Sequence, residues 1–451
     1  MTIDTDRKLR LLKGATLAAC AVLVSIATQA AEPQPSGTGA QSVPLVIRAA
    51  RIFDSVSGTL VTGGSVVVQG ERIVSVGADA KIPAGAQVID MGDATLLPGF
   101  IDAHVHLSWE FPPNYYLGFH QRLSRFPAEQ AHYAAAYARK TLEAGFTTVR
   151  NLGSDDFQDV GLRNAINAGV AVGPQILAAV HLIGSTGGHC DGPPVPPDRV
   201  KRKGLIEGIC NGADQCREAV RNQLKYGADV IKICASGGVL SEADPVDVPQ
   251  FTPAELEAMV SEAHAWRRKV AAHAHGDRAA RLAVEAGVDS IEHGSLLSEE
   301  TLRLMKRKGT YLVPTRLAFT SVLERVDTVP PQVAAKIRSV ADAHAEMFRT
   351  AMKVGVPIAL GTDAAVYPHG RNAEEFRLMK EMGMAPAAAL LAGTREAAKL
   401  LGVDSQVGTL EAGKWADIVA VPGNVLDNIA ATEHPLLVMR QGRIVMQRPA
   451  K

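Results

Sequence analysis

The sequence has no excess of charge of either sign, because 47 lysines and arginines are matched by 47 aspartates and glutamates. A chain without a positive field has no general attraction to nucleic acid or to an anionic membrane surface. We therefore expect a small-molecule partner, and we expect the mature protein to bind neither nucleic acid nor a membrane.

Cysteine is also scarce, with five residues among 451. Four of them lie beyond the N-terminal segment, and their spacing does not resemble a structural zinc site. Cys210 and Cys216 are the only close pair. They form either a disulfide, which an oxidising compartment permits, or free thiols that are buried as small apolar side chains.

The apolar stretch near the N-terminus, residues 15–27, is short against the ~20 residues of a membrane-spanning helix. It follows basic residues at positions 7–13 and precedes small residues near Ala30, which is the pattern of a secretory signal peptide. We expect cleavage near Ala30 or Ala31, and hence a periplasmic or secreted mature protein.

Residues 1–31 are therefore interpreted as a signal peptide and residues 32–43 as a flexible lead. Two alternatives stay open for this end of the chain. The segment could remain uncleaved as a membrane anchor, or "LAAC" at 17–20 could be a lipoprotein box, although most of the apolar run follows Cys20.

The rest of the chain divides by sequence pattern into a middle segment typical of an α/β fold and two flanking segments typical of β-strands. Residues 44–98 and 405–447 contain short β-branched runs separated by glycine, aspartate and serine turns, which predicts a β-sandwich domain built from both chain ends. Residues 99–404 alternate eight short apolar strands with helical stretches, which predicts a parallel (β/α)8 TIM barrel. In that fold the catalytic residues lie at the carboxyl ends of the strands.

The first of these strands, in "LLPGFIDAHVHLSWE" at 96–110, carries two histidines, His104 and His106. Residues i and i+2 of a strand point to the same side, so both imidazoles converge on one point. Such a pair alone is weak support for a metal site, because one is expected by chance roughly 0.4 times in a chain with this histidine content.

The other strand ends strengthen the case for a site. Polar side chains in apolar strands are costly unless they are paired or bound to a metal. They occur at or near the ends of six strands, as His104, His106, His189, Lys232, His273, His275, His293 and Asp363. Convergence of these residues on one barrel mouth predicts a metal centre.

The motifs "PGFIDAHVHL", "VIKICASGG", "HAHG", "IEHG" and "GTDA" resemble the amidohydrolase superfamily of metal-dependent hydrolases over nearly the whole mature chain. Because its fourth strand contains a lysine, Lys232, the sequence resembles the binuclear branch of this superfamily. In that branch the lysine is carboxylated and bridges two metals. Within this branch the sequence is most similar to Xaa-Pro and Xaa-Arg dipeptidases and to ochratoxin-hydrolysing amidohydrolases. Relatives with this barrel commonly self-associate, so the resemblance also implies a homo-oligomer.

The resemblance implies a ligand set for two Zn²⁺ ions per chain, with Mn²⁺ or Co²⁺ as substitutes. His104, His106 and Asp363 would hold one ion, His273 and His293 the other, and carboxylated Lys232 would bridge both. Lysine chemistry agrees independently, because burial and nearby cations disfavour the ammonium and leave an amine that can attack CO₂.

Three residues are assigned catalytic roles. Asp363 would take a proton from the attacking water and pass it to the leaving amine. His275 would contact the substrate, and His189, on the glycine-rich "GSTGGHCDG" loop, would polarise the scissile carbonyl or hold a substrate carboxylate. A purely structural role stays open for His189 and His275.

We therefore expect a metal-dependent hydrolase of amide or peptide bonds next to a free carboxylate, acting on dipeptides or N-acyl amino acids. A cyclic amide or imide hydrolase or a deaminase on the same barrel is the alternative enzyme. A catalytically silent scaffold is the alternative outside enzymes.

Overall fold

The computed structural model describes residues 43–192, 195–196 and 198–449. The predicted signal peptide, and all of the predicted lead except its last residue, lie outside the described residues. Among the residues that are described, no helix has the length and apolar character needed to cross a membrane.

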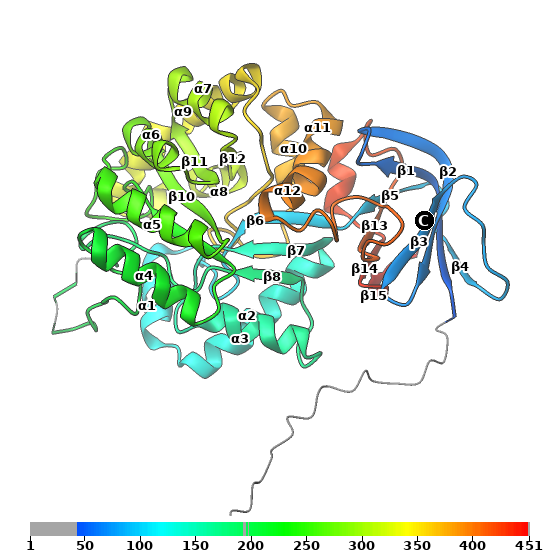
Figure 1. Ribbon diagram of the computed structural model, residues 1–451, viewed down its shortest axis with the longest axis horizontal. Helices are drawn as coiled ribbons and strands as arrows, with labels where there is room; N and C mark the ends of the chain where they lie inside the picture. The colour runs from blue at the N-terminus through cyan, green and yellow to red at the C-terminus, as the bar shows by residue number, and fades with distance from the viewer. Residues whose placement is uncertain (1–42, 193–194, 197, 450–451) are drawn as a thin grey trace, which may run out of the picture. The chain divides into compact units, whose positions relative to one another are not determined.

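Strands from both chain ends join a single sheet (Figure 1). Its strands are β1 (Leu45–Asp54), β2 (Thr59–Gln69), β3 (Arg72–Gly77), β4 (Gln87–Asp90), β5 (Ala94–Pro98), β13 (Ile418–Pro422), β14 (Leu437–Arg440) and β15 (Arg443–Gln447). The order is β15-β14-β13-β5-β1-β2-β3, with β4 beside β1, and antiparallel pairing of β5 with β13 joins the two chain ends. The arrangement of this sheet as a sandwich domain with the expected boundaries stays a prediction.

The middle of the chain contains two parallel sheets. The first consists of β6 (Phe100–Val105), β7 (Phe146–Asn151) and β8 (Gln175–Ala178), and the second of β9 (Val230–Cys234), β10 (Lys269–Gly276), β11 (Ser290–Leu296) and β12 (Tyr311–Val313). Most of their residues are buried on both sides of the strand, as expected for parallel strands covered by helices. The predicted α/β class is thereby confirmed.

Hydrogen bonds connect the two parallel sheets. Next to β8, Ile183 donates its N–H to the carbonyl of Lys232 at 2.8 Å and accepts from Cys234 at 2.9 Å. At the other junction, Leu312 donates to Pro357 at 2.8 Å, and Ala103 donates to Leu360 at 2.9 Å.

The eighth predicted strand, residues 358–364, forms no regular strand but lies between β12 and β6 through these bonds. Asp363 has a φ of 57°, in the left-handed region, which interrupts extended geometry at the place where its side chain is needed. A regular eight-stranded barrel therefore stays a prediction.

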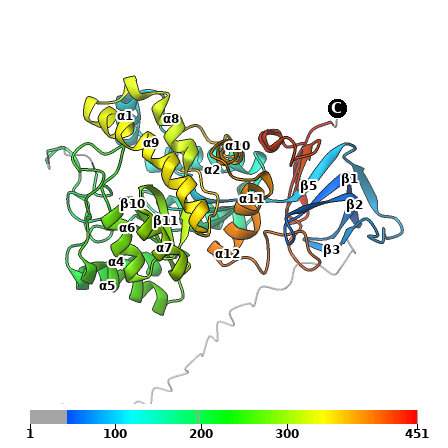
Figure 2. The same ribbon diagram turned by 90° about the horizontal axis from the view of Figure 1, so that it is seen from above.

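Helices follow the strands along the chain and surround the parallel sheets in both views (Figures 1 and 2). They are α1 (Tyr115–Ser124), α2 (Pro127–Glu143), α3 (Gln158–Asn167), α4 (Ala213–Lys225), α5 (Pro253–Ala265), α6 (Asp277–Ala286), α7 (Glu299–Lys308), α8 (Arg316–Leu323), α9 (Pro331–Val354), α10 (Glu374–Glu381), α11 (Pro386–Leu391) and α12 (Ala397–Leu401). Local sequence sets their ends. In α7, the Ser298 hydroxyl accepts from the backbone N–H of Thr301, and Gly309 at φ 74° ends the helix.

The two largest of four buried apolar clusters stabilise the two parts of the described chain. The larger lies between the parallel strands and their helices, and contains Phe100, Phe146 and Phe376, whose ring centroids are 5.0–6.4 Å apart. The smaller lies within the sheet made by both chain ends and includes Ile47 and Ile418. The buried polar residues of the strand ends belong to neither core, and they form the candidate site.

Candidate active site

Three of the predicted ligands form a compact group where β6 ends. His104 and His106 point their Nε2 atoms toward Asp363, at 3.6 Å and 3.3 Å from its Oδ1. Each of the three offers a ligand atom, and these atoms lie within 4.8 Å of one another. This is the group that the sequence assigned to one metal.

A second group forms where β10 and β11 end. His273, His275 and His293 are buried, and their ligand atoms also lie within 4.8 Å of one another. The sequence assigned the metal to His273 and His293 and left His275 for the substrate. The geometry brings His275 to the same point, with its ring stacked on that of His293 at a centroid distance of 4.9 Å.

Lys232 lies close enough to both groups for its charge to act on His104, His273 and His293. The His104 and His293 rings are themselves only 5.1 Å apart, so the two groups adjoin. The Lys232 Nζ is buried and has no hydrogen-bond partner in the part of the chain that the structure describes. Burial lowers the pKa of Lys232 to about 8, against the opposite effect of Glu292 and Asp363.

All five histidines of the two groups have one ring nitrogen engaged in a hydrogen bond: His273 contacts the Gly237 carbonyl through Nε2 at 3.1 Å and keeps Nδ1 available, and the other four keep Nε2 available. The Nδ1 atoms of His104, His106, His275 and His293 contact Glu292 Oε2 (2.8 Å), the Gly153 carbonyl (3.1 Å), Ser295 Oγ (2.8 Å) and Thr315 Oγ1 (2.8 Å), respectively. Partners of this kind orient metal-ligating imidazoles and fix their tautomers. The donor set therefore fits two divalent metal ions, and the buried Lys232 amine without a partner fits a bridging carbamate.

A buried ion pair next to His104 was not foreseen from the sequence. The guanidinium of Arg150, in β7, donates to Glu292 Oε1 at 2.9 Å, while the other carboxylate oxygen of Glu292 contacts His104. Burial alone would raise the pKa of Glu292, but the Arg150 charge and the His104 contact lower it to about 2. The available signal was an arginine inside the otherwise uncharged strand "FTTVRN" and the glutamate of "IEHG".

Three residues of the candidate site have strained backbone conformations. His293, Thr315 and Asp363 have φ values of 69°, 52° and 57°, which residues other than glycine rarely adopt. Such conformations cost about 1–3 kcal/mol each and persist where the surrounding structure enforces them. These conformations orient His293 and Asp363, two of the proposed ligands, toward the candidate metal site. Thr315 is oriented so that its hydroxyl contacts His293.

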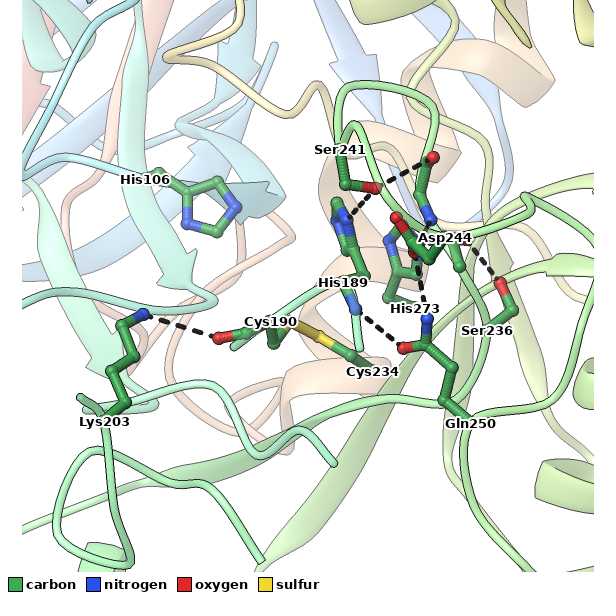
Figure 3. Close-up of a disulfide and its surroundings, with 12 residues drawn as sticks. His106, His189, Cys190, Lys203, Cys234, Ser236, Ser241, Asp244, Gln250 and His273 are labelled. Carbon is green, nitrogen blue, oxygen red and sulfur yellow. Dashed lines mark hydrogen bonds between the residues drawn. A yellow bond between two sulfur atoms is a disulfide. The ribbon is translucent and has the colours of Figure 1, made fainter. Parts of the chain in front are cut away.

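His189 extends over the second group from the loop after β8 (Figure 3). Its ring stacks on His273 at a centroid distance of 4.4 Å, and its Nδ1 lies 3.0 Å from Ser241 Oγ. The Gln250 side chain accepts its backbone N–H at 2.9 Å. Burial lowers the pKa of His189 to about 4, so the ring is neutral near pH 7.

Two disulfides lie in this region. Cys210 and Cys216 are bonded, with Cα atoms 5.0 Å apart, which selects the first of the two alternatives that the sequence left open. The second disulfide was not foreseen from the sequence: it joins Cys190, next to His189, to Cys234, the last residue of β9, with Cα atoms 6.2 Å apart (Figure 3). It ties the His189 loop to the strand that carries Lys232.

A cavity of about 410 Å³ opens above the two groups, a size typical of small-molecule sites. All eight predicted residues line it, namely His104, His106, His189, Lys232, His273, His275, His293 and Asp363. Aromatic side chains, among them Trp109, Tyr115 and Phe319, form part of its wall. The arrangement can hold metal ions and a small organic substrate together.

Comparison with known proteins agrees with this geometry. The model of the amidohydrolase family matches residues 95–445, which include every residue of the candidate site. The chain belongs to the amidohydrolase family. It is accordingly a hydrolase that acts on carbon–nitrogen bonds, and its α/β fold matches those of solved amidohydrolase structures.

Several relatives of this family member are similar over nearly their whole length. Ochratoxinase from Aspergillus niger is 32% identical over 441 residues, covering 91% of this chain and 90% of that enzyme. A solved Xaa-Pro dipeptidase with methionine bound in its active site is 38% identical, with a TM-score of 0.85 and coverage of 89% and 99%. A solved prolidase in complex with N-methylphosphonate-L-proline is 31% identical, with a TM-score of 0.82 and coverage of 90% and 100%.

Proposed function

We propose that this amidohydrolase uses two metal ions to cleave an amide or peptide bond next to a free carboxylate. Its substrates would be dipeptides or N-acyl amino acids, including the amide of ochratoxin A. The observation that carries the proposal is the pair of adjoining ligand groups around the buried, unpartnered Lys232 amine. The relatives support the substrate class, because they include a dipeptidase, a prolidase and an ochratoxinase.

In this proposal His104, His106 and Asp363 would hold one ion, His273 and His293 would hold the other, and Lys232, once carboxylated, would supply an anionic ligand shared by both. Imidazole and carboxylate ligands suit Zn²⁺, with Mn²⁺ or Co²⁺ as substitutes. When bound, two such ions would lower the pKa of a shared water so that hydroxide is available near neutral pH.

The chain's own groups would complete the reaction. Asp363 accepts the proton of the attacking water and delivers it to the leaving amine, which a carboxylate beside His104 and His106 can reach. His189, held neutral over His273, would donate a hydrogen bond from Nε2 to the scissile carbonyl oxygen or to a substrate carboxylate, with the Ser241 hydroxyl donating to its Nδ1 in place of the Gly238 carbonyl. His275 contacts the substrate.

A substrate panel tests the proposal. The zinc-reconstituted protein is incubated with N-acyl amino acids, Xaa-Pro and Xaa-Arg dipeptides, ochratoxin A and hydantoins, and metal content is measured in the same preparation. We expect two metal ions per chain and turnover of the linear substrates. Turnover of cyclic amides alone would contradict the proposal and favour a cyclic amide hydrolase, and one metal ion per chain would favour a mononuclear deaminase.

A further inference from the structure

The cavity has a positive end that the proposed chemistry does not use. Arg122, from α1, contacts the Asp155 carboxylate at 3.2 Å, and the Lys203 ammonium lies 3.4 Å from the carbonyl oxygen of Cys190. Burial alone would raise the pKa of Asp155, but Arg122 and Lys203 together hold it below its ordinary value. Lys203 itself forms no ion pair with any described residue, since Asp155, Asp191 and Glu207 act on it only at longer range, and its ammonium is available to a substrate carboxylate.

This positive end adjoins the His104, His106 and Asp363 group. The Arg122 guanidinium lies 5.7 Å from the centre of the Trp109 ring, and that ring stacks on His106 at 4.8 Å. Lys203 belongs to the same end because its charge acts on Asp155 and on Arg122. It is held there by the carbonyl of Cys190, which is disulfide-bonded to Cys234 (Figure 3).

The loop after β9, residues 236–250, forms a negative end. Lys336, from α9, donates to the carbonyl oxygens of Gly238, Ser241 and Asp244, and its Nζ lies 3.8 Å from Asp244 Oδ1. This ammonium therefore holds the loop in place, and its single positive charge acts on both Asp244 and Glu242, which leaves one negative charge in excess.

Glu242, on the same loop, is held only by neutral donors, the Tyr115 hydroxyl and the Gln332 amide, each at 3.3 Å. No lysine, arginine or histidine of the described residues forms an ion pair with it. One negative charge is therefore left uncompensated at this end of the cavity.

The negative end adjoins the histidine group of the second metal. Ser241, next to Glu242, contacts the ring of His189, and His189 stacks on His273 (Figure 3). Asp244 and Lys336 also lie close enough to act electrostatically on His189. The positive end therefore adjoins the first ligand group and the negative end the second, and α1 connects them, since its Tyr115 contacts Glu242 and its Arg122 lies at the positive end.

Building on the proposed function, we infer that the site selects zwitterionic dipeptides, binding the substrate carboxylate at Arg122 and Lys203 and its ammonium at Glu242. The orientation follows from the proton path. The leaving amino acid carries the free carboxylate, and its nitrogen takes the proton from Asp363, whose histidine partners adjoin the positive end. The acyl residue, with its ammonium, then extends past His189 toward Glu242.

Three substrates with the same scissile bond separate the two ends. They are alanyl-phenylalanine, its N-acetyl derivative, which lacks the ammonium, and its C-terminal amide, which lacks the carboxylate. We expect wild-type kcat/KM to be highest for the free dipeptide, because only that substrate engages both ends.

Substitutions at the positive end should act only through the carboxylate. Losing one charge-assisted hydrogen bond costs roughly 1.5–3 kcal/mol, which is on the order of 10- to 100-fold in kcat/KM. We expect Lys203→Gln and Arg122→Gln to lower kcat/KM by this factor for the free and N-acetylated dipeptides and to leave the amide unchanged. Lys201→Gln, on the same loop but outside the cavity lining, is the matched control and should change none of the three.

Glu242→Gln should show the reciprocal pattern. The glutamine carbonyl can still accept from Tyr115, and its NH₂ can donate to Gln332 once that amide turns its oxygen inward, so the charge is removed with little change in the loop contacts. We expect kcat/KM to fall about tenfold for the two substrates with a free ammonium and to stay constant for the N-acetyl derivative. Equal effects on all three substrates, or the opposite pattern, would overturn the assignment of the ends.

The experiment distinguishes a wrong assignment of the charged ends from a wrong proposed function. If wild type hydrolyses none of these peptides, the proposed reaction is wrong, but calorimetric binding of the same three compounds still tests the charged ends. Binding that weakens with Lys203→Gln only when the carboxylate is free supports them, and binding indifferent to the substrate's charges overturns them.

Discussion

At the scale of single residues, Lys232 is the side chain on which the proposed centre most depends. Lys232→Ala should fold, because Ile231 and Ile233 remain buried on the other side of β9. It should bind at least one metal ion more weakly and lose several orders of magnitude in turnover, since no other side chain supplies a bridging carbamate. Metal analysis and kinetics check this, with partial rescue expected from a short carboxylic acid.

One outcome for the Lys232→Ala variant would contradict this prediction. A Lys232→Ala protein that keeps two metal ions and near wild-type turnover would show that the lysine is a structural residue. The proposed centre would then have to be abandoned.

Substitution of Glu292 should lower both metal affinity and folding stability, because its carboxylate contacts the proposed ligand His104 and the buried Arg150. Glu292→Gln removes the carboxylate that contacts His104 and Arg150, so metal affinity should fall roughly 10- to 100-fold. Stability should also fall by about 3–5 kcal/mol, because Arg150 is left buried without its partner. Metal titration and denaturant unfolding measure the two effects separately.

The double variant Arg150→Met with Glu292→Gln separates these roles. It removes both buried charges, so most of the stability should return while the metal affinity stays low. Recovery of both quantities would mean that the carboxylate does not orient His104.

His273 and His275 should differ although they lie on one strand. His273→Ala is expected to lose metal, whereas His275→Ala should keep two ions and lose rate or substrate affinity. The test matters because both rings contribute to the same ligand group. Equal metal loss in the two variants would make His275 a third protein ligand of the second metal.

At the scale of elements, the Cys190–Cys234 disulfide should matter for catalysis as well as for stability. Its sequence separation of 44 corresponds to about 4 kcal/mol of loop-closure stabilisation. It also positions His189 over His273. A Cys190→Ala, Cys234→Ala variant should therefore retain its metal ions and lose about 10- to 100-fold in kcat.

The other disulfide supplies the matched control. The Cys210–Cys216 bond spans six positions, which corresponds to about 2 kcal/mol, and neither residue lines the cavity. Cys210→Ala, Cys216→Ala should lower the unfolding free energy without changing turnover. Equal kinetic loss in both double variants would show that loop ordering in general, and not His189 placement, limits the rate.

At the scale of the whole molecule, we propose that the protein is exported, which fits the presence of two disulfides. Protein made with its N-terminal segment in a bacterial host should be recovered from the periplasm with a mature end near Ala31 or Glu32. N-terminal mass spectrometry of the active fraction checks this. Active cytosolic protein that retains Met1 would contradict the prediction.

The sequence by itself determined the α/β class and the residues of the ligand groups. Both depend on local rules, because strand periodicity places residues i and i+2 on one side and parallel strands end at one edge. These rules predicted that His104, His106, His273 and His293 converge before any contact between strands was known, whereas their assignment to two metal ions came from the resemblance to the amidohydrolase superfamily and stays a prediction. The same rules overstated regularity at residues 358–364, where the strain at Asp363 interrupts the strand.

Only the tertiary structure decided which distant residues face one another. Arg150 and Glu292 are 142 positions apart, and no local pattern pairs a buried arginine with a glutamate on another strand. The Cys190–Cys234 bond likewise depends on how long loops fold back over the strand ends. So does the position of the oppositely charged Lys203 and Glu242 in one cavity. Loop conformation is set by packing and hydrogen bonds across the whole chain, whereas strand periodicity is written in a few neighbouring residues.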